Sequence, residues 1–536
     1  MAAYYLESFG CRASQADGDA IAVQLDRMGL RAAGTLAAAD VLIVNTCTVT
    51  AEADRDARSA IRRAERVNPG LQVVVTGCYA QRAPAEIAAL PGVAAVVGNS
   101  HKDQVASIAV QLARRQFTGG SVQPDSTPRK AGAASGFVPL AALMANPAAE
   151  ASAWTGPSAH TSAYTHASAY TLTGDIFAHT DFTLPSLPAS ALRAESGGQP
   201  RSRTRPTLKI QDGCGNRCTF CVIPSTRGNS RSLPATAALD AVREFVDAGG
   251  VELVVSGINL GQWGRDLRAG NEAGNGNKAR FADLLAEILE TTALPRLRIS
   301  SVEPMDWTEG LIALMQRWGR GPHPRLARHA HLPLQSGSDR ILRRMHRRYR
   351  PWHYAERVAA IHAASPEAAI GADVMVGFPG ESEADFAENY DFLAAQPFTY
   401  LHLFPFSARP GTPAWELHRE NPVPVVAVRE RMAALQSLVA RKNHAFRAGF
   451  AGKTLSAVTL VAAEPARSAS HSAALTDNFL AVELDEIVPA NTMLTMRITG
   501  LTNHGLRAVP MQEPGGRAEP SSAHPMATAD ALPPSS

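Results

Sequence analysis

Short apolar runs alternate with helical stretches in two separate parts of this sequence, and this alternation limits the folds that it can adopt. The longer part, residues 203–440, contains six predicted strands, at 207–211, 252–256, 297–301, 330–334, 370–376 and 400–404. Each strand is followed by a stretch in which apolar residues recur at helical spacing. Strands that alternate with helices favour a parallel sheet with helices on its faces. Six such repeats predict an incomplete (β/α)6 barrel instead of the full eight-fold arrangement.

Residues 1–118 show the same alternation on a smaller scale. Predicted strands at 4–9, 41–44 and 72–75 alternate with predicted helices at about 17–29, 51–67 and 83–90. Thr50 is placed to cap the second of these helices, because its hydroxyl can accept a hydrogen bond from the first turn. We therefore expect an open parallel α/β domain here, and an α/β multidomain protein overall.

The remaining segments differ in composition. Residues 119–202 and 513–536 are rich in Ala, Ser, Thr and Pro and keep no helical or strand period, so we expect a disordered insert and a disordered tail. A helix is predicted at about 425–447. After it, residues 447–512 contain apolar or alternating runs separated by turns, which predicts a small β-barrel of a kind that often binds RNA.

Three cysteines lie close together in the loop after the first strand of the longer part: Cys214, Cys218 and Cys221. Three thiolates at this spacing can hold a [4Fe–4S] cluster and leave one iron without a protein ligand. Structural zinc sites usually take four ligands from paired CxxC motifs, and the sequence has no such pair of motifs. A partial set of disulfides, or a clustering by chance, would also account for three cysteines in one loop.

The other three cysteines, Cys11, Cys47 and Cys78, each follow one predicted strand of residues 1–118. The carboxyl ends of parallel strands meet at one edge of a sheet, where ligands bind. We therefore expect these thiols to converge in space. The alternative is that they are three unrelated buried cysteines, which are common in protein cores.

Polar residues and glycines collect at the predicted mouth of the barrel. The candidates for cofactor or substrate contacts are Gly257, Ser301, Glu303, Gln335 and Asp373. Their alternative role is in the turns that follow the strands.

A run of six arginines between Arg340 and Arg350, with Tyr349 and Trp352 beside it, could bind phosphate and unstacked bases. A solvated helix face explains the same run equally well.

Composition excludes some classes of protein. A formal net charge of +3 excludes a strongly polycationic nucleic-acid binder, so any contacts to RNA would be local. The sequence has no charged-then-apolar leader and no apolar run of about 18 residues. We therefore expect a cytoplasmic protein without a membrane segment, with its six cysteines reduced, and a monomer.

Together these motifs resemble those of the radical S-adenosylmethionine methylthiotransferases, above all the branch that modifies threonylcarbamoyladenosine in bacterial tRNA. The likeness covers residues 1–118 and 203–510. The segments that carry it are Ser8-Phe-Gly-Cys11, Asn45-Thr-Cys-Thr-Val-Thr50, Thr76-Gly-Cys-Tyr-Ala80, the loop 209–228, His331-Leu-Pro-Leu-Gln-Ser-Gly-Ser-Asp339, Asp373-Val-Met-Val-Gly-Phe-Pro-Gly-Glu381 and Phe404-Pro-Phe-Ser-Ala-Arg-Pro-Gly-Thr412.

The resemblance implies two [4Fe–4S] clusters, one held by Cys214, Cys218 and Cys221 and the other by Cys11, Cys47 and Cys78. It implies a radical S-adenosylmethionine core at 203–440 and a TRAM-like RNA-binding β-barrel at 447–512. Two molecules of S-adenosylmethionine would be used per turnover, one as the radical source and one as the methyl donor. A reductant such as flavodoxin or ferredoxin would supply the electron.

The implied reaction places a methylthio group on carbon 2 of the adenine next to the anticodon. That base lies in a single-stranded loop, where it can enter a pocket. Two different functions remain open at this point. One is methylthiolation of an aspartate in a ribosomal protein, and the other is a non-catalytic electron carrier with two clusters.

Overall fold

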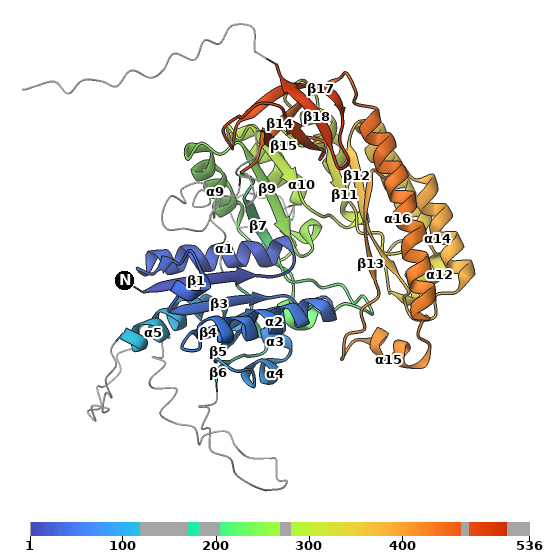
Figure 1. Cartoon of the computed structure of the whole chain (residues 1–536). Coiled ribbons are helices and arrows are strands. Elements are labelled where there is room, and N and C mark those ends of the chain that lie inside the picture. Colours follow the sequence, from blue (N-terminus) through green and yellow to red (C-terminus); the bar gives the residue numbers. More distant parts are fainter. Residues whose placement is uncertain (1, 118–168, 183–203, 268–279, 462–470, 512–536) are drawn as a thin grey trace, which may run out of the picture.

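The computed structural model describes residues 2–117, 169–182, 204–267, 280–461 and 471–511. They form an N-terminal sheet domain, a partial barrel and a small closed barrel, in that order along the chain (Figure 1).

The N-terminal domain is built on a parallel sheet with the strand order β2-β1-β3-β4-β5-β6. Its strands are β1 (Ala3–Ser8), β2 (Arg31–Ala32), β3 (Val41–Thr46), β4 (Gln72–Gly77), β5 (Val93–Gly98) and β6 (Tyr170–Leu172). Its helices are α1 (Arg12–Arg27), η1 (Leu36–Ala38), α2 (Ala51–Val67), α3 (Cys78–Arg82), α4 (Pro84–Ala88), η2 (Asn99–Gln104) and α5 (Val105–Phe117). Apolar cores lie on both faces of the sheet, so the prediction of an open parallel α/β domain is confirmed. Thr50 caps α2 as predicted, since its hydroxyl accepts a hydrogen bond of 3.2 Å from the N–H of Ala53.

The prediction that residues 119–202 are without structure is wrong for 169–182. Residues Tyr170–Leu172 pair in parallel with β5, and a short 3-10 helix, η3 (Ile176–Ala178), follows and buries Ile176. The physical reason is that β5 would otherwise leave a row of unpaired backbone groups at its outer edge. A strand of three residues is too short to give a recognisable period in the sequence. The rest of the predicted insert, and the predicted tail 513–536, lie outside the described residues.

The partial barrel contains the six predicted parallel strands. They are β7 (Thr207–Asp212), β9 (Glu252–Gly257), β10 (Arg296–Ile299), β11 (His329–His331), β12 (Ala369–Val376) and β13 (Tyr400–Pro405). Full ladders join β7-β9-β10 and β11-β12-β13, and the bridges Leu297↔Leu326 and Ser301↔His331 connect the two groups. A short strand, β8 (Arg231–Ser232), pairs antiparallel with β7 at one edge. The incomplete (β/α)6 arrangement is thereby confirmed.

Several helices pack an apolar stripe against the outside of this barrel, and other, mostly short helices lie in the loops between its strands or beyond them. They are α8 (Ile223–Arg227), α9 (Ala235–Asp247), η4 (Leu260–Gln262), α10 (Phe281–Thr291), η5 (Pro304–Asp306), α11 (Glu309–Trp318), α12 (Asp339–Arg344), α13 (Pro351–Ala364), α14 (Glu383–Ala395), α15 (Pro413–Glu420) and α16 (Val425–Ala448). On α9, for example, Leu239, Val242 and Phe245 are buried in the main core of the barrel.

The chain ends in the small closed β-barrel that the sequence predicts. Its strand order is β14-β15-β16-β18-β17, and its core includes Leu455, Val482 and Met496. The strands are β14 (Thr454–Thr459), β15 (Ser472–Thr476), β16 (Ala481–Leu484), β17 (Met493–Leu501) and β18 (Leu506–Pro510).

The partial barrel contacts both neighbouring units. Helix α1 lies between the N-terminal sheet and strands β7 and β9 (Figure 1). On the other side, Arg298 of β10 donates to the backbone carbonyl oxygens of Thr476 and Asp477 in the small barrel, at 2.9 and 3.1 Å. One continuous body therefore brings residues from all three units toward the mouth of the partial barrel.

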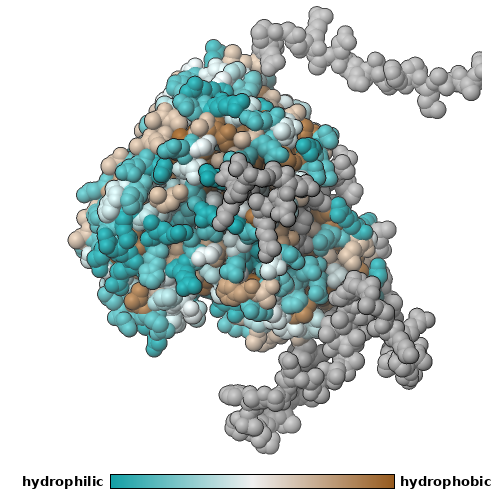
Figure 2. Space-filling view, turned by 180° about the vertical axis from the view of Figure 1, so that it is seen from behind, coloured by the Kyte–Doolittle hydropathy of each residue, from teal (hydrophilic) through white to brown (hydrophobic). Residues whose placement is uncertain are grey.

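The described face seen from behind is predominantly hydrophilic, with hydrophobic residues in small groups between polar ones (Figure 2). Within the described ranges, every helix is too short or too polar to serve as a membrane span.

Candidate functional site

Cys11, Cys47 and Cys78 lie at the carboxyl ends of β1, β3 and β4, and the structure brings them together. A Cβ atom on Gly10, which has a φ of +96°, would lie 2.4 Å from Cβ and 2.7 Å from Sγ of Cys47. Only glycine therefore lets the Cys11 loop pack onto Cys47. Burial, and then the neighbouring Cys78 and Cys11, raise the pKa of Cys47 to about 12. The expected convergence of the three thiols is confirmed.

The sulfur atoms of this group face positive or donor groups. Cys11 is the N-cap of α1, so the positive end of that helix lies at its sulfur. Cys78 accepts hydrogen bonds from Nε of Arg227 at 3.2 Å and from Nδ2 of Asn99 at 3.5 Å. Such surroundings stabilise thiolates, which are the form that binds metal.

The second group follows β7, where Gly213 turns the chain at a φ of +78°. A Cβ atom there would lie 2.0 Å from the carbonyl oxygen of Asn229, so the turn into Cys214 requires glycine. Burial raises the pKa of Cys221 to about 12, with smaller contributions from Cys218 and Cys214. The sulfur of Cys214 accepts from Nδ2 of Asn259 at 3.5 Å.

Both groups fit an iron–sulfur cluster by their donor chemistry. All six cysteines are free thiols, and each group offers three sulfurs with few competing ligands. Burial opposes the charge of an isolated thiolate, whereas bound metal displaces the proton and removes that penalty.

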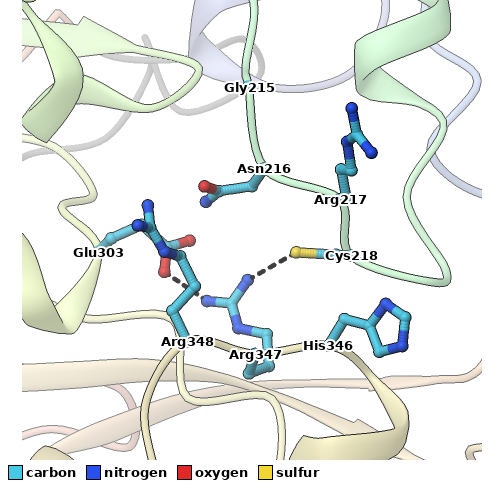
Figure 3. A pocket seen from close by; sticks show the side chains of 8 residues that line it. All are labelled: Gly215, Asn216, Arg217, Cys218, Glu303, His346, Arg347 and Arg348. Carbon is cyan, nitrogen blue, oxygen red and sulfur yellow. Dashed lines mark hydrogen bonds and ion pairs between the residues drawn. The ribbon is translucent and has the colours of Figure 1, made fainter.

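A cavity of about 360 Å³ opens beside Cys218 (Figure 3). Arg347 lies between Cys218 and Glu303: its Nη1 donates to Sγ of Cys218 at 3.2 Å, and its Nη2 donates to Oε2 of Glu303 at 2.5 Å. Gly215, Asn216 and Arg348 line the same cavity. Its volume suits a small molecule bound next to the second cysteine group.

A second cavity, of about 320 Å³, is lined by residues from all three units. The N-terminal domain contributes Cys11, Arg12 and Ala13, the partial barrel contributes Ser256, Gly257, Ser300, Ser301, His329, His331, Tyr400 and His402, and the small barrel contributes Phe479. Residues of the two cysteine-bearing units thus share one cavity.

Buried charges connect the two cysteine groups. Arg227, at the end of the second cysteine loop, pairs with Asp17 of α1 at 3.0 Å and with Asp212 of β7 at 2.8 Å. Lys102 and Lys209 complete this cluster around the same two carboxylates. Burial alone would raise the pKa of Asp212, but Lys102, Lys209 and Arg227 hold it well below its usual value.

The five residues predicted for the barrel mouth do not all line one cavity. Glu303 lines the cavity beside Cys218, whereas Gly257 and Ser301 line the second cavity. Asp373 lines neither cavity, but it contacts His331 and His402 of the second one at 3.4 and 3.2 Å. Gln335 borders neither cavity. It is buried with a φ of +70°, and its Oε1 has no hydrogen-bond partner within the described chain.

The arginine run is divided between surface and interior: Arg340, Arg343 and Arg348 are exposed, whereas Arg347 is buried. Arg340, Arg343 and Arg350 are paired with the carboxylates of Asp385 or Asp339, and Arg347 is buried against Cys218. Tyr349 is buried as well. The run alternates between helix surface and interior, because α12 ends at Arg344 and the following turn directs Arg347 inward.

Sequence reasoning missed several residues that line these cavities. His329 and His331 alternate on β11, and Tyr400 and His402 alternate on β13, which lies on the other side of β12, so each pair points to one face. This alternation with a period of two residues is the signal in the sequence that could have identified them. Arg12 directly follows Cys11 and carried no signal of its own.

Comparisons with known proteins agree with this architecture. Residues 3–98 match a family described as uncharacterized protein family UPF0004, and residues 208–393 match the Radical SAM superfamily. The chain is 31% identical over 483 residues to the threonylcarbamoyladenosine tRNA methylthiotransferase MtaB of Bacillus subtilis, covering 90% of each chain. It is 32% identical over 454 residues to the protein of the same name in Aquifex aeolicus, covering 85% of this chain and 92% of that one.

Relatives with another substrate in their name are almost as similar. The tRNA-2-methylthio-N(6)-dimethylallyladenosine synthase of Salinispora arenicola is 30% identical over 436 residues, covering 80% of this chain and 72% of its own. Among solved structures, the radical S-adenosylmethionine methyltransferase TsrM of Kitasatospora setae shares the fold with a TM-score of 0.50 and 14% identity, covering 77% of this chain and 75% of its own.

Proposed function

The chain belongs to the radical S-adenosylmethionine tRNA methylthiotransferases, and we propose that it methylthiolates carbon 2 of threonylcarbamoyladenosine next to the anticodon of tRNA. Enzymes of this family use two [4Fe–4S] clusters and S-adenosylmethionine. The substrate is part of the proposal, because relatives named for dimethylallyladenosine are similarly close.

The observation that carries the proposal is the shared cavity. Cys11 from the first cysteine group and Gly257 and Ser301 from the barrel mouth line the same space. A transfer of sulfur to an unreactive C–H position needs the sulfur site and the radical source to face one substrate atom. A cavity lined by only one of the two units could not meet this requirement.

The residues proposed to hold the clusters are the two cysteine groups. Cys214, Cys218 and Cys221 would hold the cluster that supplies the electron for cleavage of S-adenosylmethionine, and Cys11, Cys47 and Cys78 would hold the cluster that supplies sulfur. In both, three thiolates leave one iron for a ligand that is not protein. A protein reductant such as flavodoxin or ferredoxin provides the electron.

We propose that side chains of the protein position the reactants and shield them from water. Arg347 fixes Glu303 in the cavity beside Cys218, where Glu303 can accept hydrogen bonds from the hydroxyls or ammonium of S-adenosylmethionine. The rings of Tyr400, Phe479 and His329 line the second cavity, and we propose that an adenine stacks against them. Phe479 belongs to the small barrel, which we propose as the part that grips the anticodon loop.

A strain that lacks the gene for this protein tests which nucleoside is the substrate. Liquid chromatography and mass spectrometry of its tRNA nucleosides should show loss of 2-methylthio-threonylcarbamoyladenosine and accumulation of threonylcarbamoyladenosine. The chain expressed from a plasmid should restore the modification, whereas a variant without Cys214, Cys218 and Cys221 should not.

The other outcomes of this experiment contradict the proposal. Loss of methylthio-dimethylallyladenosine instead would assign the other tRNA substrate. Unchanged tRNA with loss of methylthio-aspartate in a ribosomal protein would assign a protein substrate. If purified, reduced protein released no 5′-deoxyadenosine from S-adenosylmethionine, it would be a carrier of electrons and not a radical enzyme.

A further inference from the structure

Arg12 is a half-buried cation that faces the second cavity without a counter-ion. It is the first residue of α1 and lies next to Cys11 in the cavity wall. Its guanidinium makes no ion pair or hydrogen bond with any residue that the structure describes. Burial, and then the nearby Arg298, lower the pKa of Arg12, yet a guanidinium stays charged at neutral pH. A desolvated charge of this kind is costly unless an anion comes to it.

Arg12 lies near a group of arginines that surround Glu252. The charge of Glu252 acts on Arg12, but Glu252 is already shared by Arg298, Arg296 and Arg205. The carboxylate of Glu252 accepts from Nε of Arg298 at 2.8 Å, inside the core. Asp477 also acts on Arg296, but neither Glu252 nor Asp477 forms an ion pair with Arg12 in the part of the chain that the structure describes.

Aromatic rings form another part of the cavity wall. The rings of His329 and Tyr400 are stacked with their centroids 5.9 Å apart, and Phe479 lies 5.3 Å from Tyr400. The ring of Tyr400 lies over Gly371, where any side chain would displace it, because a Cβ atom would come within 2.0 Å of the ring. His331 and His402 both contact the carboxylate of Asp373. This wall suits a flat base, with the positive charge of Arg12 at one end.

From this arrangement we infer that Arg12 binds the carboxylate of the threonylcarbamoyl group and selects that nucleoside over ones with an uncharged substituent. The inference rests on the proposed function and names the residue that sets its specificity. A guanidinium binds a carboxylate through two parallel hydrogen bonds, which a dimethylallyl group cannot accept. An uncharged substituent would leave Arg12 desolvated and unpaired, so the cavity rejects it.

The experiment uses synthetic anticodon stem-loops that carry either threonylcarbamoyladenosine or isopropylcarbamoyladenosine, which lacks the carboxylate and hydroxyl. The wild-type protein should bind and methylthiolate the first stem-loop with a clear preference. Arg12→Gln should lower kcat/KM for the first stem-loop about 10- to 100-fold and leave the second nearly unchanged, so that the preference disappears. Arg12→Lys should restore part of it.

Controls separate specificity from damage to the cluster site. Fluorescence anisotropy measures stem-loop affinity without turnover, and it should show the same loss of preference. Iron content and release of 5′-deoxyadenosine should stay at wild-type values in Arg12→Gln. Arg27→Gln, at the exposed far end of the same helix, should behave as wild type in every assay.

The possible results are distinct. Equal losses on both stem-loops, or a loss of 5′-deoxyadenosine release, would overturn the inference, since Arg12 would then serve the fold or S-adenosylmethionine. An unchanged preference in Arg12→Gln would overturn it as well. If the wild-type protein itself fails on the threonylcarbamoyl stem-loop, the proposed function fails, independently of Arg12.

Discussion

Nε of Arg227 donates a hydrogen bond of 3.2 Å to Sγ of Cys78, although the two residues come from different structural units. Arg227 ends the loop that carries the second cysteine group, whereas Cys78 belongs to the first group. The same guanidinium pairs with Asp17 and Asp212, one from each unit. The distance between the two proposed cluster sites is therefore fixed by a buried charge cluster and not only by apolar packing.

Arg227→Gln should weaken the contact between the N-terminal domain and the partial barrel. It should also weaken the proposed cluster site of Cys11, Cys47 and Cys78. Without the guanidinium, Asp17 and Asp212 keep Lys102 and Lys209, with Arg231 4.0 Å from Asp212, and Cys78 loses a charged donor. Removing one partner from a buried ion pair costs about 3–5 kcal/mol in the free energy of unfolding. In a background with Cys214, Cys218 and Cys221 changed to Ala, iron per chain reports the first site alone, and it should fall markedly. Iron retention equal to that of the background would show that Arg227 has no part in that site.

Changing either cysteine group to Ala should remove about half of the iron and sulfide from protein purified without oxygen, because the two groups hold separate clusters. Loss of Cys214, Cys218 and Cys221 should abolish 5′-deoxyadenosine release. Loss of Cys11, Cys47 and Cys78 should leave that release in place and abolish methylthiolation. Complete loss of iron from either variant would mean that the two sites are not independent.

Arg347→Gln should impair cleavage of S-adenosylmethionine. The change removes the hydrogen bond to Cys218 and leaves Glu303 without its partner in the cavity. Hydrogen bonds to charged groups contribute about 1.5–3 kcal/mol, which corresponds to roughly a 10- to 150-fold lower rate of 5′-deoxyadenosine release. Arg348→Gln is the matched control, because Arg348 lines the same cavity and makes neither contact. Equal effects of the two changes would point to cavity charge alone.

Much of the fold follows from the sequence because strand and helix periods are local. The six barrel strands and the small β-barrel were predictable in this way. The convergence of Cys11, Cys47 and Cys78 also followed, since parallel strands bring their carboxyl ends to one edge. Strand β6 was missed because three residues are too few to show a period, and its pairing with β5 is a long-range contact.

The chemistry of the cavities was less predictable, because it depends on how separate units meet. The direction of α1 brings Arg12 to the barrel mouth, and nothing local in the sequence specifies that direction. Arg347 was grouped with five other arginines, yet the turn after α12 directs it to Cys218. The run of charge in the sequence therefore did not indicate which arginine reaches the second cysteine group.

Glu252 is the subject of the last prediction, because it connects the partial barrel with the small barrel through Arg298. Burial alone would raise the pKa of Glu252, but Arg298, Arg205 and Arg296 lower it from 4.5 to about 2. Glu252→Gln would leave these arginines buried and without their carboxylate, at a cost of about 3–5 kcal/mol in the free energy of unfolding near pH 7. Glu367→Gln is the control, since Glu367 is a partly exposed carboxylate whose ion pairs should contribute at most about 1 kcal/mol.

At low pH, the free energy of unfolding of the wild-type protein should no longer exceed that of Glu252→Gln. The folded pKa of Glu252 is lower than the unfolded one, so its contribution is fully present above pH 4.5 and is lost as the pH falls toward about 2. Urea unfolding of the cluster-free proteins, followed by tryptophan fluorescence, should give a constant difference between pH 5.5 and 7 and a shrinking one below pH 4.5. A difference that persists unchanged at pH 3 would mean that the loss in Glu252→Gln comes from altered packing and not from the charge of the carboxylate.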